Sequence, residues 1–239
     1  MTRFSIGKKI ALLIDPDKTT EELLDRIVDT SVKANVDVFL VGSSILLRNS
    51  VAWVVRFLKE RSSIPVYLFP GSVMQICDDA DGILLLSLIS GRNPELLIGQ
   101  HVLAAPSLKA AQFDIVPTGY LLIDGGIHSS VEYMSDTRPI PANKPDIAAC
   151  TAMAAEQLGM RSVYLEAGSG AKTPVPASLV AAVRKEISIP IWVGGGIRTP
   201  ESAVAACIAG ADIVVVGTAI EENHGLIAPI ADAIHQLNK

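Results

Sequence analysis

The sequence predicts an α/β protein that forms a (β/α)₈ TIM barrel. Eight short aliphatic and β-branched runs recur along the 239 residues, and helical patterns separate most of them. The runs are continuously apolar, as in parallel strands that are buried on both faces. A barrel of this class has about 250 residues, and no linker of biased composition divides the chain, so we expect one domain over residues 1–239. A doubly wound open sheet is the alternative, although it seldom needs eight regular units.

The predicted strands and helices alternate from the beginning of the chain to its end. The strands are Lys9–Ile14, Val36–Val41, Ile64–Phe69, Gly82–Ile89, Gly119–Ile123, Ser162–Glu166, Ile189–Val193 and Asp212–Val216. The clearest helices are Thr20–Ala34, Asp146–Leu158, Pro176–Glu186 and Pro200–Ala209. Thr19 or Thr20 is the expected N-cap of the first helix. Gly159 and Gly210 stand where glycine commonly ends a helix.

Two intervals depart from this alternation. Only Gly71–Asp81 is available between the third and fourth strands, which is barely enough for a stable helix, so we expect the third helix to be short or missing. Ile127–Lys144 contains Pro139 and Pro141 and has little periodicity. This stretch indicates a long loop above or beside the fifth strand.

The composition is apolar, with a mean hydropathy of +0.40 and 49% hydrophobic residues, so a membrane protein has to be considered. A spanning helix needs roughly 20 consecutive apolar residues. The most apolar stretches, Ile10–Ile14, Ile83–Ile89 and Ile213–Val216, are much shorter than that. The sequence therefore excludes transmembrane helices, and we expect the apolar residues to be packed inside the protein.

The N-terminus, the cysteines and the charge bear on location and partners. The first apolar segment has five residues before Asp15 and Asp17 interrupt it, which is too short for a secretory signal. The three cysteines are far apart and form no metal-ligand spacing, which favours a reducing compartment. We therefore expect a cytoplasmic protein. The net charge of −5 and the lack of a basic stripe argue against nucleic acid as a partner.

Glycine clusters follow the last two predicted strands. Gly194, Gly195 and Gly196 follow the seventh strand, and Gly217 with Thr218 follows the eighth. In this fold the active site lies at the carboxyl ends of the strands, and phosphate binds after strands seven and eight. Bare backbone amides and a helix N-terminus attract the anion. We predict a phosphate site here; the alternative is that these glycines only form tight turns.

Two carboxylates follow the first strand. Asp15 and Asp17 share one sharp turn, and Ser44 follows the neighbouring second strand. Mg²⁺ usually takes one or two carboxylates together with phosphate oxygens of the substrate. We predict a magnesium site at Asp15, with Ser44 as a further ligand or a phosphate contact. In the alternative reading, Asp17 caps the following helix, Asp15 holds the turn and Ser44 caps a helix.

Glu166 closes the otherwise apolar sixth strand and precedes a further glycine cluster, so it is the candidate general base. Tyr164 stands two residues earlier and faces the same side of the strand. It lines either the substrate pocket or the packed barrel interior. Lys18 and Arg198 are either phosphate contacts or solvated turn residues.

Six segments of the chain resemble the geranylgeranylglyceryl phosphate synthase family, including its bacterial heptaprenylglyceryl phosphate synthase branch. They are Leu13–Lys18, Val41–Ser44, Leu68–Gly71, Tyr164–Gly170, Val193–Pro200 and Val216–Glu221. The resemblance runs in order from about Lys9 to Glu222. Leu13 stands where the heptaprenyl branch has a lysine, so the chain is more similar to the archaeal-type group and its bacterial relatives.

The resemblance implies a modified barrel whose third helix is missing or replaced. It also implies Mg²⁺-dependent transfer of a prenyl group from a polyprenyl diphosphate, most simply geranylgeranyl diphosphate, to the C3 hydroxyl of sn-glycerol 1-phosphate. By position, Asp15 and Ser44 match the metal-associated residues of the family. The residues that match its glycerol phosphate pocket are Tyr164, Glu166, Gly168, Ser169, Gly170, Gly194, Gly195, Gly196, Gly217 and Thr218.

Several points stay open at this stage. Arg92–Gln100 has leucines where archaeal members often have aromatic residues, so the length of the prenyl chain is not fixed. Family members associate as dimers or hexamers, which implies a homo-oligomer, and a lipid-handling enzyme of this composition is expected to touch the membrane surface. Two other functions remain: a phosphosugar isomerase or synthase, and a catalytically silent barrel that binds a phosphorylated metabolite.

Overall fold

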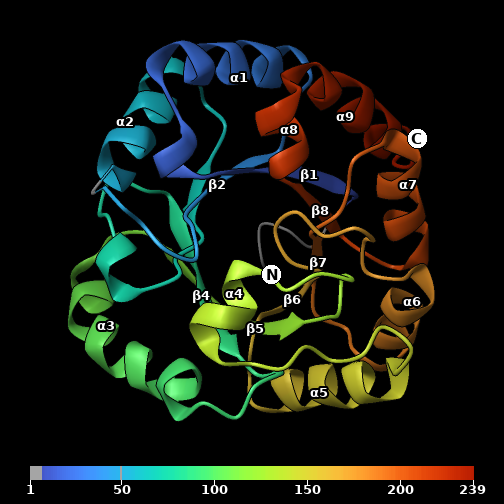
Figure 1. Ribbon diagram of the computed structural model, residues 1–239. Coiled ribbons are helices and arrows are strands. Elements are labelled where there is room, and N and C mark those ends of the chain that lie inside the picture. Colours follow the sequence, from blue (N-terminus) through green and yellow to red (C-terminus); the bar gives the residue numbers. More distant parts are fainter. Residues whose placement is uncertain (1–6, 49) are drawn as a thin grey trace.

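The structure is a computed structural model, and it describes residues 7–48 and 50–239. Eight parallel strands close a barrel in sequence order, from β1 to β8 and back to β1 (Figure 1). The strands are β1 (Lys9–Ile14), β2 (Val38–Val41), β3 (Val66–Leu68), β4 (Gly82–Leu88), β5 (Asp114–Leu122), β6 (Ser162–Glu166), β7 (Ile191–Gly194) and β8 (Ile213–Val216). The predicted TIM-barrel fold is confirmed.

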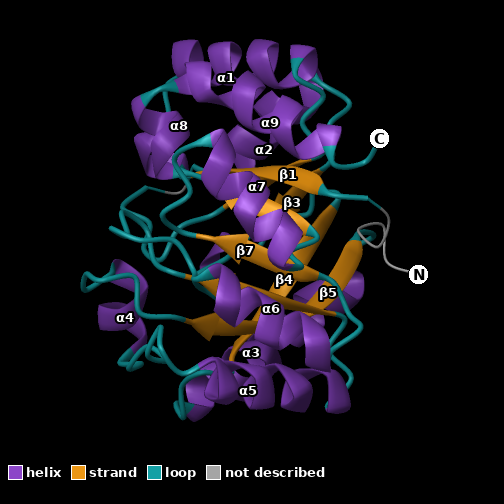
Figure 2. Cartoon of the chain, turned by 90° about the vertical axis from the view of Figure 1, so that its right-hand side faces the viewer, coloured by secondary structure: helices purple, strands orange, loops and turns teal. Residues whose placement is uncertain are grey.

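Helices surround the barrel as a ring, and two short ones lie at one end of it (Figures 1 and 2). The outer helices are α1 (Glu21–Lys33), α2 (Val51–Arg61), α3 (Gln100–Ala110), α5 (Pro145–Gln157), α6 (Ala177–Glu186), α7 (Pro200–Ala209) and α9 (Ile227–Gln236). The short helices are α4 (Ser130–Ser135) and α8 (Thr218–Glu222). Single turns are η1 (Pro16–Lys18), η2 (Val73–Gln75), the π-turn η3 (Glu95–Gly99) and η4 (His224–Leu226).

The helix ends follow the capping signals of the sequence. The Thr20 side chain accepts a hydrogen bond from the backbone N–H of Leu23 at 3.3 Å, which makes Thr20 the N-cap of α1. Gly159 and Gly210 have φ angles of 84° and 123°, values that are costly for residues with a Cβ atom. Both glycines lie at helix C-termini, as predicted.

The largest difference between the predicted and the observed strand limits is in β5, which begins at Asp114 and not at Gly119. Pro117 lies inside this strand opposite Leu85 of β4. Proline lacks the N–H that a central strand normally donates, so it reads as a strand breaker in the sequence. Seven residue pairs join β4 and β5, so the segment remains a strand in spite of that lost hydrogen bond.

Side chains alternate along each strand between two apolar cores. One core lies between the strands and the outer helices, and includes Leu12, Leu165 and Val193. The other fills the barrel interior, where Tyr164 and Trp192 are fully buried. Because residues at i and i+2 face the same side of a strand, the residue that follows Tyr164 on this side is Glu166.

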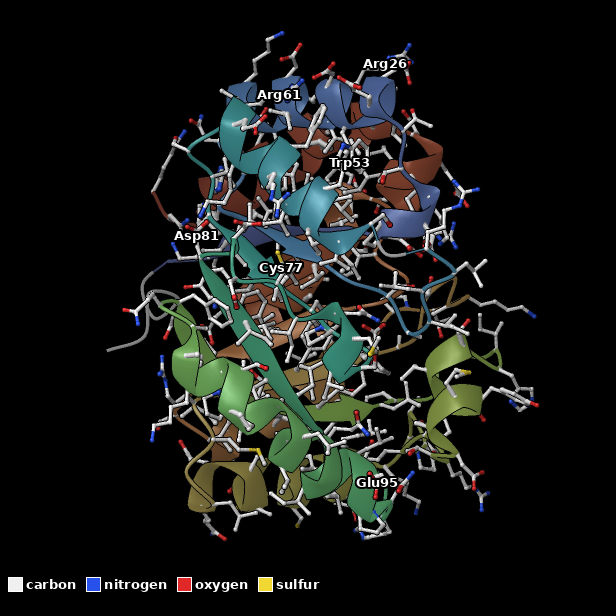
Figure 3. The ribbon with its side chains drawn as sticks, turned by 90° about the vertical axis from the view of Figure 1, so that its left-hand side faces the viewer. Arg26, Trp53, Arg61, Cys77, Asp81 and Glu95 are labelled. Carbon is white, nitrogen blue, oxygen red and sulfur yellow. The ribbon has the colours of Figure 1, made fainter. Side chains whose placement is uncertain are left out.

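The third helix of the regular barrel pattern is replaced by one turn. Residues 69–81, all of which are described, contain only η2 between β3 and β4. Figure 3 shows the segment around Cys77 lying between α2 and α3, where the ring of helices is interrupted. The expectation of a short or missing third helix is confirmed.

The prediction of a plain loop over Ile127–Lys144 is wrong, because this stretch contains α4. The Ser129 hydroxyl accepts a hydrogen bond from the backbone N–H of Glu132 and caps this helix. Asp136 ends the helix with a φ angle of 49°. The two prolines lie beyond this end, so they do not interrupt the helical turn.

In the part of the chain that the structure describes, no helix is long and apolar enough to cross a membrane.

Candidate active site

A cavity of about 550 Å³ opens at the carboxyl ends of the barrel strands. Its polar part is lined by Asp15, Ser43, Glu166 and the loops after β7 and β8. An apolar part continues along β4 towards α3. Figure 2 shows α4 and α8 at this end of the barrel. The cavity therefore brings together the strand ends that the sequence marks as chemically important, from β1, β2, β6, β7 and β8.

Glu166 lies at the base of the polar part and is 6% exposed. Its carboxylate accepts a hydrogen bond from the backbone N–H of Gly168 at 2.7 Å. Burial raises the pKa of Glu166 to about 7, while the Gly168 amide and the Tyr164 hydroxyl act in the opposite direction. A carboxyl group with this pKa can accept a proton near neutral pH, which fits the predicted role of a general base.

Tyr164 contributes both to the barrel interior and to the cavity wall. Its ring stacks on Tyr120 with a centroid distance of 5.4 Å and an interplanar angle of 16°. The Phe69 ring lies 4.9 Å from it on another side. These contacts hold the Tyr164 ring in place, so this residue packs in the barrel interior and also lines the cavity.

Gly194 and Gly195 leave room for these two side chains. A Cβ atom on Gly194 would overlap the Tyr164 hydroxyl and lie 3.2 Å from a Glu166 carboxylate oxygen. A Cβ atom on Gly195 would overlap the other Glu166 oxygen. These glycines therefore do more than form a tight turn, because any side chain there would displace Tyr164 or Glu166.

The predicted phosphate-binding loops meet across the mouth of the barrel. The hydroxyls of Ser169 and Thr218 lie 3.1 Å apart, although 49 residues separate them in the sequence. Gly168, Gly170 and Gly196 have positive φ angles of 97°, 76° and 71°. This backbone conformation favours glycine. Gly170 and Gly196 line the cavity, whereas the Gly168 amide is already bonded to Glu166.

Gly217 is different from the other glycines of the site. Its φ angle is −124°, and a Cβ atom there would meet Leu13 at an ordinary distance of 3.5 Å. Packing within the chain therefore does not demand glycine at this position. Space remains in front of its backbone, which is the space that an anion needs in order to approach the amides.

Asp15 directly follows β1, the strand that pairs with β8, and Ser43 rather than Ser44 is its hydroxyl partner. The Ser43 hydroxyl donates to Asp15 Oδ2 at 3.2 Å. Ser44 lines the cavity, but among the described residues its hydroxyl forms no hydrogen bond with Asp15. The chain turns after Val41, the last residue of β2, so strand alternation no longer predicts which serine faces Asp15.

Asp17 does not share the direction of Asp15. Its two carboxylate oxygens accept hydrogen bonds from the backbone N–H groups of Leu47 and Arg48. Asp17 therefore fixes the loop after β2 and neither caps α1, which Thr20 does, nor faces the Asp15 carboxylate. Both aspartates line the cavity, but β1 ends at Ile14 and η1 follows it, so the two carboxylates have different hydrogen-bond partners.

Two cations lie beside the polar part of the cavity. Lys18 Nζ is 3.4 Å from Asp15 Oδ2 and 3.1 Å from a Glu221 carboxylate oxygen. Arg198 forms a longer ion pair, 3.5 Å, with Glu222. Both side chains are near enough to the cavity to meet a bound anion, and both already have carboxylate partners at its rim.

The apolar part of the cavity follows β4 from the barrel mouth to its outer side. Leu86 and Leu88 line the inner portion, and Ile83 and Leu85 line the outer portion. At its outer end, His101 Nε2 lies 3.1 Å from the Ser87 hydroxyl. Burial lowers the pKa of His101, so the imidazole is neutral at pH 7. The walls of this part are therefore uncharged.

Three residues of the site were not identified from the sequence. They are Ser43, Gln75 and Tyr120. Ser43 is next to Ser44 in the Gly-Ser-Ser segment, so the sequence did indicate a functional hydroxyl in this segment. Gln75 and Tyr120 stand in segments where nothing in the local pattern marks a polar or aromatic side chain as functional.

The chain is similar to a set of proteins with one shared name. The family model described as the PcrB family matches residues 5–237. Geranylgeranylglyceryl phosphate synthase of Chitinophaga pinensis is 50% identical over 95% of this chain and 90% of its own length. The protein of the same name from Thermococcus gammatolerans is 45% identical over 95% and 89%, respectively.

A solved structure has the same fold as this chain. It is the crystal structure of (S)-3-O-geranylgeranylglyceryl phosphate synthase from Thermoplasma acidophilum in complex with its substrate sn-glycerol-1-phosphate. The TM-score is 0.92 at 34% identity, and the match covers 98% of this chain and 96% of that one.

Proposed function

Because the chain belongs to the PcrB family, we propose that it transfers a prenyl group from a polyprenyl diphosphate to the C3 hydroxyl of sn-glycerol 1-phosphate. It is an enzyme, a prenyltransferase of the geranylgeranylglyceryl phosphate synthase type. The product is an ether lipid precursor. The observation that carries this proposal is that a single cavity joins a polar end, with a buried carboxyl group, to an uncharged apolar part.

The polar end suits glycerol phosphate. The phosphate would meet the backbone amides of the loops after β7 and β8, together with the hydroxyls of Ser169 and Thr218. The glycerol hydroxyls would then extend towards Glu166 and Tyr164. Glu166 accepts the proton of the C3 hydroxyl as its oxygen bonds to the first carbon of the prenyl chain. The bond from that carbon to the diphosphate breaks, and the diphosphate leaves with the electron pair.

The Asp15 side of the cavity suits the diphosphate and Mg²⁺. No three His, Cys, Asp or Glu side chains gather as a metal cluster among the described residues. The donor set of one carboxylate and adjacent serines nevertheless fits Mg²⁺, which completes its shell with water and phosphate oxygens. Asp15 would hold the ion, with Ser43 and Ser44 nearby, and Lys18 would give up its contact with Asp15. The bound ion would neutralise charge on the leaving diphosphate.

The apolar part suits the prenyl chain, and we propose geranylgeranyl diphosphate as the preferred donor. Leucine and isoleucine side chains of β4 form one wall, and Ala104 of α3 lies at the opposite side. The small Ala104 side chain leaves space where a larger residue would shorten this part. The identity of the donor therefore depends on the outer end of the cavity, near His101.

We also propose that the cavity rim touches the membrane surface, where a long prenyl chain resides. Ile45, Leu47 and Met134 line the cavity and yet are 51%, 82% and 54% exposed. Apolar and aromatic side chains of this kind insert at the headgroup boundary. Sedimentation with phosphatidylcholine vesicles tests this, and Leu47→Ser should reduce the bound fraction.

A homo-oligomer is also part of the proposal. Ile98, Val102 and Leu103, in η3 and α3, are each at least 60% exposed in the single chain. Such side chains are typical of subunit interfaces when they are contiguous. Light scattering coupled to gel filtration tests the assembly, and a mass near that of one 25.3 kDa chain would contradict it.

The transfer reaction is tested by incubating the protein with Mg²⁺, labelled sn-glycerol 1-phosphate and prenyl diphosphates of several lengths. Label in the organic phase supports prenyl transfer. A phosphosugar isomerase or synthase shares the glycine loops but needs no apolar part of the cavity, and it would leave the label in water. A binding-only barrel would also leave it there, without chemical change.

A further inference from the structure

We propose that Gln75 is a positioning residue for the diphosphate end of the reaction, because it locks the backbone of Ser43. This inference rests on the proposed function and adds a residue to it. Gln75 belongs to η2, the single turn that replaces the third helix of the barrel pattern. The turn η2 therefore contributes to the polar part of the cavity, because its residue Gln75 holds the backbone of Ser43.

Gln75 holds Ser43 through both ends of its side-chain amide. The Ser43 backbone N–H donates to Gln75 Oε1 at 3.1 Å, and Gln75 Nε2 donates to the Ser43 carbonyl oxygen at 2.7 Å. Gln75 is 2% exposed, so water cannot easily substitute for these bonds. A paired amide of this kind fixes the rotation of the peptide units on both sides of Ser43.

The same loop is tightly confined by its neighbours. A Cβ atom on Gly42 would lie 2.6 Å from the Phe69 carbonyl carbon, and one on Gly71 would lie 3.0 Å from the Cα atom of Ser44. At the other end of the loop, Asp17 accepts from two backbone N–H groups. The loop is thus held at two points, and Gln75 is the one nearer to Asp15.

The position of Ser43 controls a contact of Asp15. The Ser43 hydroxyl donates to Asp15 Oδ2, the oxygen that also faces Lys18. If the Ser43 backbone turns, this hydroxyl leaves Asp15, and the carboxylate loses the partner that orients it. We therefore expect Gln75 to affect diphosphate and Mg²⁺ binding and to leave glycerol phosphate binding nearly unchanged, because no hydrogen bond links Gln75 or Ser43 to the loops after β7 and β8 in the described part of the chain.

The test compares Gln75→Leu with wild type. Gln75→Met, whose unbranched side chain can follow the path of glutamine, is the second variant in case leucine does not fold. Ser43→Ala and its combination with Gln75→Leu examine the coupling. Thr118→Val is the matched control, because it removes a fully buried hydroxyl that pairs with Ser162 at 2.8 Å, and neither residue lines the cavity. Two readouts apply: steady-state kinetics and calorimetric binding of Mg²⁺ with inorganic pyrophosphate.

We expect Gln75→Leu to raise the KM for prenyl diphosphate about tenfold, with the KM for glycerol phosphate within about twofold of wild type. Pyrophosphate binding should weaken by a similar factor. The double variant should be no worse than Gln75→Leu alone, because Ser43 acts through the same contact. Thr118→Val should lower the Tm and leave both KM values unchanged.

Equal changes in both KM values, or unchanged pyrophosphate binding, would overturn the positioning role of Gln75. Failure of the proposed function looks different, because wild type itself would then form no prenylated product. In that case pyrophosphate binding still tests Gln75, and a Gln75→Leu variant that binds like wild type would reject the inference.

Discussion

The Tyr164 hydroxyl occupies the place where a side chain at position 194 would begin. A Cβ atom on Gly194 would overlap that hydroxyl and lie 2.9 Å from the ring carbon that bears it. The aromatic stack with Tyr120 and Phe69 prevents the Tyr164 ring from moving aside. Glycine at position 194 is therefore required to leave room for the Tyr164 hydroxyl, which lines the cavity.

This relationship predicts different outcomes for two glycine substitutions. Gly194→Ala should lower the Tm and turnover together, because it displaces Tyr164 and Glu166 in the free protein. Gly217→Ala should leave the Tm closer to wild type, since its Cβ would meet only ordinary contacts, yet it should weaken glycerol phosphate binding. Differential scanning fluorimetry and calorimetry with glycerol phosphate measure both. If Gly217→Ala binds normally, the phosphate does not approach these amides.

Glu166 predicts the pH dependence of turnover. Its carboxylate is the active form, and its pKa is raised to about 7 by burial. Turnover should therefore rise as the pH increases through about 7 and level off above it, provided that the substrates are saturating. Glu166→Gln should lower turnover by about 10² to 10⁴ with modest changes in KM. A pH profile that is flat from 6 to 8 in wild type would remove Glu166 as the base.

The same pKa shift predicts how stability changes with pH. The ordinary pKa is 4.5 and the folded value is about 7, so the unfolded chain releases the proton first as the pH rises. The free energy of unfolding should fall between these two pH values, by up to about 3 kcal/mol. Below the ordinary pKa the carboxyl group is protonated in both the folded and the unfolded state, so its burial no longer lowers the free energy of unfolding in this way.

Denaturant unfolding of wild type and Glu166→Gln measures this cost. The glutamine retains an oxygen that can accept from the Gly168 N–H, and it carries no charge to bury. Its stability relative to wild type should therefore increase from pH 5 to pH 8. A constant difference over this range would contradict the raised pKa of Glu166 in the folded protein.

Asp15 and Asp17 should behave differently although they are two residues apart. Asp15→Ala should lose transfer even with excess Mg²⁺, because the carboxylate proposed to hold the ion is gone. Asp17→Asn retains one oxygen acceptor for the Leu47 and Arg48 amides, so it should reduce stability slightly and keep most of the turnover. Kinetics at increasing Mg²⁺ separate them. Transfer that is retained by Asp15→Ala would reject the metal role of this residue.

Ala104 tests the assignment of the apolar part of the cavity to the prenyl chain. Ala104→Phe would fill space between α3 and β4. We expect transfer from geranylgeranyl diphosphate to fall at least about tenfold, and transfer from shorter donors to be less affected, because the added ring excludes several methylene groups. Ala154→Phe, at an exposed position of α5, is the control. An equal loss of transfer with donors of all lengths would mean that the prenyl chain binds outside this part of the cavity.

Much of this architecture was predictable because local signals agree with the fold. β1 and β6 have the predicted limits, and Glu166 and Tyr164 share a side because strand alternation continues to the end of β6. The short interval after β3 indicated the missing helix, since chain length alone limits what can form there. Gly168, Gly170 and Gly196 could likewise be singled out, because few other residues tolerate their positive φ angles.

The remaining features depend on contacts that sequence order does not encode. Gln75 reaches Ser43 across 32 residues of the chain, and η2 has no periodicity that would indicate its direction. Ser43 and Ser44 are equivalent in the sequence until the turn after β2 is known. Asp17 lines the cavity, but its two carboxylate oxygens accept from the loop after β2, a contact that sequence order does not indicate. Ser43 and Asp17 both lie just beyond a strand end, where the period of two no longer applies.

The central claim is that one cavity brings both substrates together at Glu166. It is tested most directly by a crystal structure with sn-glycerol 1-phosphate and a non-hydrolysable thio analogue of geranylgeranyl diphosphate. We predict the phosphate on the loops after β7 and β8, the C3 hydroxyl about 2.6–3.2 Å from the Glu166 carboxylate, and the prenyl chain along β4. A glycerol hydroxyl bound away from Glu166, or a prenyl chain outside the β4 side of the cavity, would contradict the account.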